Sequence, residues 1–348
     1  MSARGVRDPW LDNTKMILVT IVVIGHAIVL MPGGEVKSRL YDFIYYFHIP
    51  AFVLITGYLS KSFRYSRKHL LALVTTLAVP YVVFSFLMVR FRHHVGGEAL
   101  LDPWLTNPRW PMWYLIVLII WRLATPVLKL HWVMVPVSIG ISLLAGLTNQ
   151  ELFDLNRAMG LLPFFVIGLH LPADWLGLVR RRGMRILGLA VVLGIWWLTQ
   201  FTDDLWSTQF FYYRAPYDEL GVTASEGMWI RARLIALALV GILGVLALVP
   251  HGRSFLTDMG RWSLVVYLYH GFVVRWLEYQ GYESWMPGNG WVSALITIAW
   301  AILLALLLAW DPLARRLNYL VDPVGTVRTL RASRSASRGA TPTTPSSR

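Results

Sequence analysis

The chain has 348 residues, of which 56% are hydrophobic and only 15% are charged, whereas soluble domains carry about 25% charged residues. This balance indicates a protein embedded in a lipid bilayer, and the formal net charge of +13 does not indicate nucleic acid, because the basic residues are scattered between apolar segments. The absence of cysteine excludes disulfides, a thiolate nucleophile and cysteine-based metal sites.

Apolar runs long enough to cross a bilayer, which takes about 17–25 residues, recur along almost the entire chain. We therefore predict an all-α integral membrane protein, built as a bundle of about ten transmembrane helices. We expect the first run to remain as an anchor, because a Pro-Gly-Gly turn follows it instead of a cleavage site. The ten segments lie at about 15–31, 41–60, 70–89, 111–130, 132–147, 157–171, 185–201, 233–249, 263–277 and 291–310.

The Lys and Arg residues predict the orientation of these spans. Most of the 32 basic residues fall on one side of the membrane if the N-terminus is inside, so the positive-inside rule places both termini in the cytoplasm. We expect a cytoplasmic segment at 1–14, a membrane domain at 15–310 and a basic tail at 311–348. The tail is expected to be disordered, because its end is rich in Ser, Thr, Arg and Pro and lacks apolar periodicity.

The first apolar run, "MILVTIVVIGHAIVLM", contains His26 at a depth where a titratable side chain is costly. Lys15 lies eleven positions earlier, which corresponds to about 20° of azimuth and about 16 Å along a helix, and Asp12 lies near the same stripe. This face is therefore expected to look into the bundle or a wet cavity. A packing histidine that is hydrogen-bonded to a neighbouring helix explains the pattern almost as well.

The second run, "YDFIYYFHIPAFVLITGYL", places Tyr41, Tyr45, His48 and Phe52 on one helical face. Pro50 lacks a backbone donor and predicts a kink that frees the carbonyl of the residue four positions earlier. His48 is a candidate partner for this opened backbone, so a structural role is favoured for it more than for His26.

Two further features concern basic residues and a third deep histidine. Arg64 and Arg67 are three positions apart, so an early start of the next helix would present them as a fork suited to phosphate oxygens, although ordinary positive-inside charge explains them as well. His270 lies in the middle of the ninth run, with Tyr267 and Ser263 on its face. Three predicted spans thus carry a deep histidine, and a packing role explains three such residues less readily than it explains one.

Several other chemistries leave no trace in the sequence. The chain contains no G-x-S-x-G elbow, no H-E-x-x-H and no phosphate-binding loop. His93, His94 and Glu98 form a possible metal set that looks more like an exposed loop pair. We therefore expect no metal.

The sequence resembles the acyltransferase 3 family of integral membrane proteins, in particular its fucose 4-O-acetylase-like branch. The pattern of a basic residue, ten positions and His matches Lys15 to His26, and the paired-arginine motif matches Arg64 and Arg67. The matching segments spread from about residue 7 to residue 310: "RDPWLDNTKMILVTIVVIGHA", "FIYYFHIPAFVLITGYL", "PMWYLIVLIIWRL", "LNRAMGLLPFFVIGLHL" and "GRWSLVVYLYHGFVV".

The resemblance implies a ten-helix O-acyltransferase of the bacterial plasma membrane. It would move an acyl group, usually acetyl, from cytosolic acyl-CoA to a hydroxyl of a carbohydrate or lipid-linked glycan. His26 would be the general base, Asp12 would orient Lys15 near the thioester or a phosphate, and Arg64 and Arg67 would hold CoA phosphates. His26 as a covalent acyl carrier stays open.

The remaining residues receive roles on the same basis. His48 and His270 are candidates for lining the acyl path or stabilising the oxyanion. We expect no further domain after the tenth span, so the acceptor would be recognised by the bundle and by the predicted outer loop at 202–232. There, aromatic side chains would either pack on a sugar ring or form an interfacial belt. The acceptor-binding candidates are Trp206, Tyr212, Tyr213 and Arg157.

Two functions of other classes compete with this prediction. A proton-coupled transporter would use the deep histidines as a relay, although no internal repeat of the kind found in many transporters is visible by eye. A membrane scaffold would carry them as packing residues only. The sequence does not identify the acceptor sugar, the acyl chain or the oligomeric state.

Overall fold

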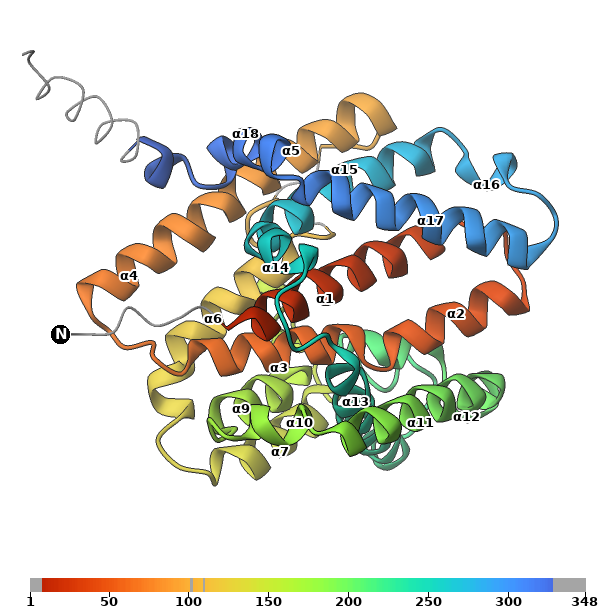
Figure 1. Ribbon diagram of the computed structural model, residues 1–348. Helices are drawn as coiled ribbons and strands as arrows, with labels where there is room; N and C mark the ends of the chain where they lie inside the picture. Colours follow the sequence, from red (N-terminus) through yellow and green to blue (C-terminus); the bar gives the residue numbers. More distant parts are fainter. Residues whose placement is uncertain (1–7, 101–102, 109, 328–348) are drawn as a thin grey trace, which may run out of the picture.

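The structure of the protein is a computed structural model that describes residues 8–100, 103–108 and 110–327. Within these ranges every regular element is a helix, and no strand occurs. The predicted all-α class is therefore confirmed (Figure 1).

Six helical stretches in the described part of the chain are long and apolar enough to cross a membrane. Each corresponds to a segment that the sequence predicts, and several extend beyond the predicted bounds. They are α1 (Pro9–Ile28), α2 with α3 (Glu35–Ser60), α4 with η1 and α5 (Arg67–Gly96), α11 with η3 and α12 (Arg182–Leu205), α13 (Ala224–Leu248) and α17 (Gly290–Ala309).

The other four predicted segments form shorter or bent helices. η2 (Leu152–Asp154) with α8 (Leu155–Gly160) is bent by 60° against α9 (Leu162–His170). Three helices of 16, 12 and 17 residues complete the set, so the predicted number of ten spans stays a prediction: α6 (Trp113–Leu128), α7 (Met134–Ala145) and α15 (Ser263–Tyr279). Short connecting elements are α10 (Trp175–Val179), η4 (Thr208–Tyr212), α14 (Phe255–Met259), η5 (Gly260–Trp262) and α16 (Tyr282–Trp285).

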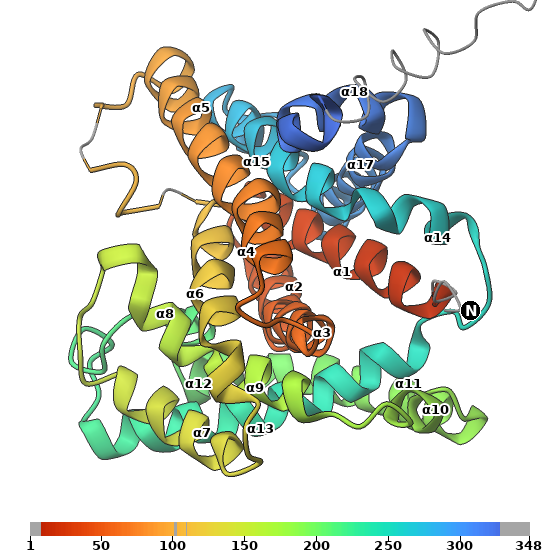
Figure 2. The same cartoon turned by 90° about the vertical axis from the view of Figure 1, so that its left-hand side faces the viewer.

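Helix α1 lies in the middle of the molecule. It begins after Asp8, whose carboxylate accepts a hydrogen bond from the Trp10 amide at 2.9 Å, and Pro9 occupies a first-turn position where its missing N–H costs nothing. Helices α14, α15 and α17 pack against one side of α1 and α2 and α3 against another (Figures 1 and 2). An otherwise apolar helix with a deep histidine is therefore surrounded by protein.

The second predicted span is divided into two helices. α2 (Glu35–Tyr45) ends before a turn at Tyr46 and Phe47, and α3 begins at His48. Pro50 cannot donate to the carbonyl of Tyr46, so the helical ladder is interrupted in front of it. The interruption predicted from Pro50 is present, as a break at Tyr46 and Phe47, four and three residues upstream of the proline.

Helices α3 and α9 touch backbone to backbone at two glycines. A Cβ atom on Gly57 would lie 2.1 Å from the carbonyl oxygen of Phe165, and one on Gly168 would lie 2.1 Å from that of Leu54. Small residues at such contacts let two helices approach closely, as is common in membrane bundles. This contact holds α3, and with it His48, against the lower layer of helices in Figure 2.

The first part of the predicted tail, residues 311–321, is helical and not disordered as expected. Helix α18 (Asp311–Val321) continues the fold beyond residue 310 and packs against α15 and α17. Ala314 and Val321, seven positions apart, are buried and give this segment an apolar stripe at helical spacing. The end of the tail, 328–348, lies outside the described residues, as does 1–7 of the N-terminal segment.

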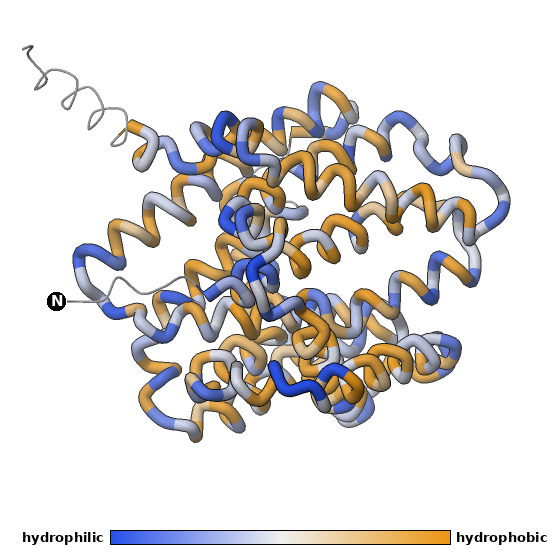
Figure 3. Tube along the Cα trace, viewed as in Figure 1, coloured by the Kyte–Doolittle hydropathy of each residue, from blue (hydrophilic) through white to orange (hydrophobic). Residues whose placement is uncertain are grey.

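Hydropathy follows this architecture. Along most helices the trace is apolar, while many of the connections at the two sides of the view are hydrophilic (Figure 3). Many large apolar side chains are exposed on the helix surfaces, for example Ile186 at 76% and Leu295 at 69%. Exposed apolar side chains of this number on long helices fit a protein that faces lipid.

Candidate active site

A cavity of about 680 Å³, here called the large cavity, opens inside the helical bundle. Its volume lies in the range of about 300–1,000 Å³ that ligand pockets occupy. Val22, His26 and Val29 contribute one stripe of α1 at i, i+4, i+7 spacing. The other deep side chains come from α2, α3, α6 and α15, and they include Tyr41, Tyr45, His48, Trp113 and Tyr267.

A second cavity of about 190 Å³, the small cavity, lies mainly between α1, α3, α6 and α15, four of the helices that line the large cavity. Lys15 and Leu18 line it from the N-terminal half of α1, so Lys15 and His26 do share one face of the helix, as predicted. Helix α3 adds residues from Phe52 to Leu59, and α6 adds a stripe from Tyr114 to Arg122.

Three aromatic residues line both cavities and separate them: Phe52, Tyr114 and Tyr267. The ring centroids of Phe52 and Tyr114 are 5.2 Å apart, and those of Tyr114 and Tyr267 are 5.8 Å apart. The Tyr114 hydroxyl is hydrogen-bonded to Thr56 Oγ1 at 2.6 Å, and the Tyr267 hydroxyl donates to the carbonyl of Pro111. We call this trio the aromatic partition.

His26 is held by two hydrogen bonds in the wall of the large cavity. Its Nδ1 lies 2.8 Å from Nε2 of His270, and the indole N–H of Trp110 donates to its Nε2 at 3.3 Å. His270 is fully buried behind His26, and its Nδ1 contacts the carbonyl oxygen of Val266 at 3.0 Å. His270 does not line either cavity as described, so the structure places it behind His26 and not along the path for which the sequence made it a candidate.

His48 lines the large cavity near the break between α2 and α3. Its Nδ1 lies 2.9 Å from the carbonyl oxygen of Ile44, so it does pair with backbone near the proline kink, although not with the Tyr46 carbonyl. A carbonyl only accepts, so Nδ1 carries the proton and Nε2 carries a lone pair. Nε2 of His48 has no hydrogen-bond partner among the described residues.

Of the three basic residues that the sequence suggested, only Lys15 lies at the small cavity. Lys15 lines it, and its ammonium group pairs with the carboxylate of Asp12 at 2.5 Å, as the predicted orienting role requires. Arg64 and Arg67 are exposed and do not belong to either lining as described. Helix α4 (Arg67–Leu73) begins only at Arg67, where Ser66 caps it, so Arg64 lies outside the helix and the two do not form a fork on one helical face.

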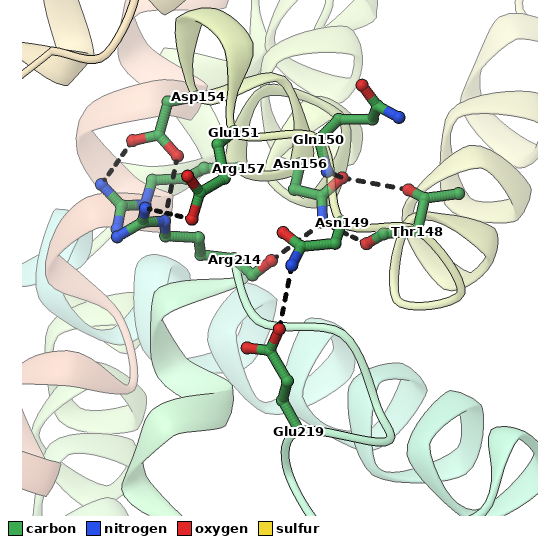
Figure 4. A network of polar contacts seen from close by, with 9 residues as sticks. All are labelled: Thr148, Asn149, Gln150, Glu151, Asp154, Asn156, Arg157, Arg214 and Glu219. Carbon is green, nitrogen blue, oxygen red and sulfur yellow. Dashed lines mark hydrogen bonds and ion pairs between the residues drawn. The ribbon is translucent and has the colours of Figure 1, made fainter. Parts of the chain in front are cut away.

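The open end of the large cavity is built by a polar network between two connections (Figure 4). Arg157 donates to Asp154 at 2.9 Å and to the carbonyl of Tyr212 at 3.2 Å, and Arg214 lies 3.7 Å from the same carboxylate. Asn149 donates to Glu219 at 2.9 Å. Arg157 lines the cavity, but these contacts engage its charge in holding the opening together.

A second ion pair fixes an arginine on the opposite wall. Arg92 lines the large cavity and pairs with Glu98 at 2.7 Å, and the Tyr279 hydroxyl donates to Glu98 at 2.5 Å. Burial raises the pKa of Glu98, but hydrogen bonds from Arg92 and Tyr279 outweigh it and lower that pKa below its usual value. Glu98 therefore stays ionised and keeps Arg92 in place. His93 and His94, which the sequence suggested as an exposed loop pair, lie instead in the last turn of α5, and Nδ1 of the half-buried His93 is 2.8 Å from the carbonyl oxygen of Glu98. The described residues hold no group of three or more His, Asp or Glu that could bind a metal.

Only one of the three aromatic acceptor candidates lines the large cavity. Tyr212 lines the large cavity, and its hydroxyl is hydrogen-bonded to that of Tyr41. Trp206 and Tyr213 are buried in the core and absent from the described lining, with Tyr213 packed against Phe164. The predicted outer loop is also shorter than expected, since α13 begins at Ala224.

The family comparison agrees with this arrangement. The chain matches the family model described as an acyltransferase domain, Acyl_transf_3, over residues 8–310. This chain belongs to the acyltransferase 3 family. No curated protein and no solved structure gave a match. A member of this family with several apolar helices of spanning length is a membrane acyltransferase.

Sequence reasoning did not select three residues that the structure places in this candidate site. Trp110 contacts the candidate base, Tyr267 belongs to the aromatic partition, and Arg122 lines the small cavity. Arg122 had a visible signal, because an arginine inside the apolar run "WYLIVLIIWRL" is costly unless it faces the interior. Trp110 had none, since its position depends on how a connecting segment folds back onto α1.

Proposed function

We propose that this acyltransferase transfers an acyl group from acyl-CoA, presented at the small cavity, to a hydroxyl group of an acceptor in the large cavity. The observation that carries the proposal is the position of His26, whose Nε2 faces a cavity that continues along the same four helices to a second, cation-lined cavity. This arrangement suits two substrates that meet from opposite directions.

In the proposed reaction His26 acts as the general base. Nε2 removes the proton of the acceptor hydroxyl while its oxygen attacks the thioester carbonyl carbon, so that a C–O bond forms and the C–S bond breaks. The proton then passes from Nε2 to the departing thiolate and gives free CoA. The Trp110 contact at 3.3 Å is longer than the usual range of about 2.7–3.2 Å, so an acceptor hydroxyl can replace it.

The donor side is proposed from charge. Lys15 and Arg122 both line the small cavity and suit the anionic groups of a CoA thioester. Arg64 and Arg67 are exposed beyond this end of α3, where they are proposed to meet the CoA phosphates from outside the cavity. Acetyl-CoA is the proposed donor, because a cavity of about 190 Å³ leaves room for a short acyl group.

The acceptor side is proposed from the hydrogen-bonding groups that line the large cavity. The lone pair of His48 Nε2 is an acceptor without a protein partner among the described residues, and Tyr41 and Tyr212 present hydroxyls nearby in the same lining. A carbohydrate supplies hydroxyl donors to such groups. We therefore propose a carbohydrate or lipid-linked glycan, in keeping with the fucose 4-O-acetylase-like branch.

The same proposal includes the setting of the enzyme. Both termini would lie in the cytoplasm of a bacterium, and the protein would span the plasma membrane with its small cavity facing the cytosol. Acyl-CoA is made there, so the donor would enter directly while the acceptor enters from the other side.

A proton-coupled transporter is less well supported. A relay through the deep histidines would run from His26 to His270 and then to the carbonyl oxygen of Val266. A backbone carbonyl accepts a hydrogen bond but has no proton to pass on, so this chain ends inside the protein.

The test uses membranes that contain the full protein and its native glycans. With radiolabelled acetyl-CoA we expect His26→Ala to reduce label in the carbohydrate fraction by at least about 100-fold, the usual contribution of a general base. His94→Ala changes an exposed histidine outside both cavities and is the matched control. Full transfer by correctly inserted His26→Ala protein would overturn the assignment.

A further inference from the structure

The hydrogen bonds around His26 determine which of its ring nitrogens carries the proton. These hydrogen bonds form a series from Val266 through His270 and His26 to Trp110. At its first end the Val266 carbonyl oxygen only accepts, so Nδ1 of His270 must donate to it at 3.0 Å. A neutral imidazole carries one proton, so Nε2 of His270 is an acceptor. The group that faces it at 2.8 Å, Nδ1 of His26, is therefore the donor.

The contact at the opposite end of this hydrogen-bond series assigns the same tautomer to His26. The indole N–H of Trp110 is a donor only, and it points at Nε2 of His26 at 3.3 Å. Nε2 of His26 therefore carries a lone pair and no proton. Two independent contacts thus assign the Nδ1–H form to the ring and leave the lone pair of Nε2 facing Trp110, which lines the large cavity together with His26.

We infer that His270 is a positioning residue that fixes the tautomer and the ring orientation of His26. The inference rests on the proposed function, in which Nε2 of His26 removes the acceptor proton. When Nε2 has gained that proton, Nδ1–H of His26 still donates to His270, so the ring does not rotate during the reaction. This is the part that a buried carboxylate plays in a serine hydrolase triad, performed here by a neutral imidazole.

The surroundings of His270 support a positioning role and not contact with substrate. Its side chain is fully buried, and it is absent from both described linings. The planes of the two imidazoles differ by only 12°, with ring centroids 5.1 Å apart. The bond from His270 to Val266 joins residues one turn apart in α15, so the helix itself sets the direction of the chain.

Two substitutions of similar size test the two hydrogen bonds of His270 independently. In His270→Gln the amide oxygen can reach the former place of Nε2 and accept from His26. In His270→Asn the shorter amide can still donate to the Val266 carbonyl but does not reach His26. A residue that only fills space would tolerate both equally, whereas a positioning residue tolerates Gln and not Asn.

The first measurement is independent of activity. Full-length protein with isotope-labelled histidine is studied in lipid bilayers by nuclear magnetic resonance, and the His26 signals are identified by their loss in His26→Ala. We expect a proton on Nδ1 and none on Nε2 in the wild type and in His270→Gln, and a loss of that preference in His270→Asn. A proton on Nε2 in the wild type would overturn the inference.

The second measurement is transfer of radiolabelled acetyl in native membranes. A positioned base contributes about 10²–10⁴-fold to rate. We therefore expect His270→Asn to lower kcat by about 10–100-fold, with KM for acetyl-CoA nearly unchanged. His270→Gln should retain most of the wild-type kcat. Equal rates in His270→Asn and wild type would refute the positioning role even if His26→Ala is inactive. Activity in His26→Ala would instead refute the proposed function, whatever the resonance result for the tautomer.

Discussion

The two cations of the small cavity differ in how their charges are compensated. Lys15 pairs with Asp12 at 2.5 Å, and its side chain is 24% exposed. Arg122 has no carboxylate within ion-pair distance among the described residues, and its buried Nε has no hydrogen-bond partner there. A guanidinium without a counter-ion inside an apolar bundle is costly, so Arg122 is the more specific indication of an anionic ligand.

A prediction at the residue scale follows for Arg122. Arg122→Gln should raise KM for acetyl-CoA by about 10-fold or more, because a hydrogen bond to a charged group contributes about 1.5–3 kcal/mol. The measurement is the dependence of transfer rate on acetyl-CoA concentration. Arg181→Gln removes an exposed arginine outside both cavities and is the control; equal KM values for the two variants would rule out a donor contact at Arg122.

At the scale of elements, four helices contribute side chains to both cavities: α1, α3, α6 and α15. Along α1 and α15 the residue numbers rise from the small cavity to the large one, while along α3 and α6 they rise in the opposite direction. The aromatic partition lies where the linings of the two cavities meet, with Tyr114 in the first turn of α6 and Phe52 and Tyr267 near the starts of α3 and α15. In the proposed reaction the thioester and the acceptor hydroxyl meet at this partition, so its three apolar rings lie where water would otherwise reach the thioester.

The contact between α3 and α9 supplies the prediction at this scale. Gly57→Ala would place a Cβ atom 2.1 Å from the carbonyl oxygen of Phe165, and forcing packed backbones apart costs about 1–3 kcal/mol. We expect a lower midpoint of thermal unfolding in detergent.

A matched variant in another helix isolates the packing effect. Gly140 lies inside α7, and a Cβ atom there would meet nothing within 4 Å. Gly140→Ala should therefore be neutral or stabilising by about 0.4–1 kcal/mol, through the entropy of the unfolded chain. If Gly57→Ala unfolds at the same temperature as Gly140→Ala, the close approach of α3 and α9 is not required.

For the whole molecule, the orientation across the membrane is the open prediction. The chain contains no cysteine, so single cysteines can report sidedness without a background. In intact cells a membrane-impermeant thiol reagent should label Asp218→Cys, in the exposed connection at the large cavity, and should leave Ser347→Cys in the tail unlabelled. Lysis should expose the tail cysteine. Labelling of Ser347→Cys in intact cells would reverse the assigned orientation.

Much of the element pattern was predictable, because helix formation by long apolar runs depends on neighbours in the chain. The break before Pro50 and the shared face of Lys15 and His26 were predictable for the same reason. The helical start of the tail was missed, since α18 is stabilised by packing against α15 and α17. The expected sugar-packing roles of Trp206 and Tyr213 do not fit their burial in the core, which composition alone does not reveal.

By itself the sequence determined that this protein is an all-helical membrane protein with deep histidines on a face that also carries Lys15. Only the tertiary structure decided that His26 meets His270, 244 positions away, and that Arg122 and not Arg64 or Arg67 lines the small cavity. Periodicity fixes which residues share one helix face, but the partner of that face depends on the packing of the whole bundle.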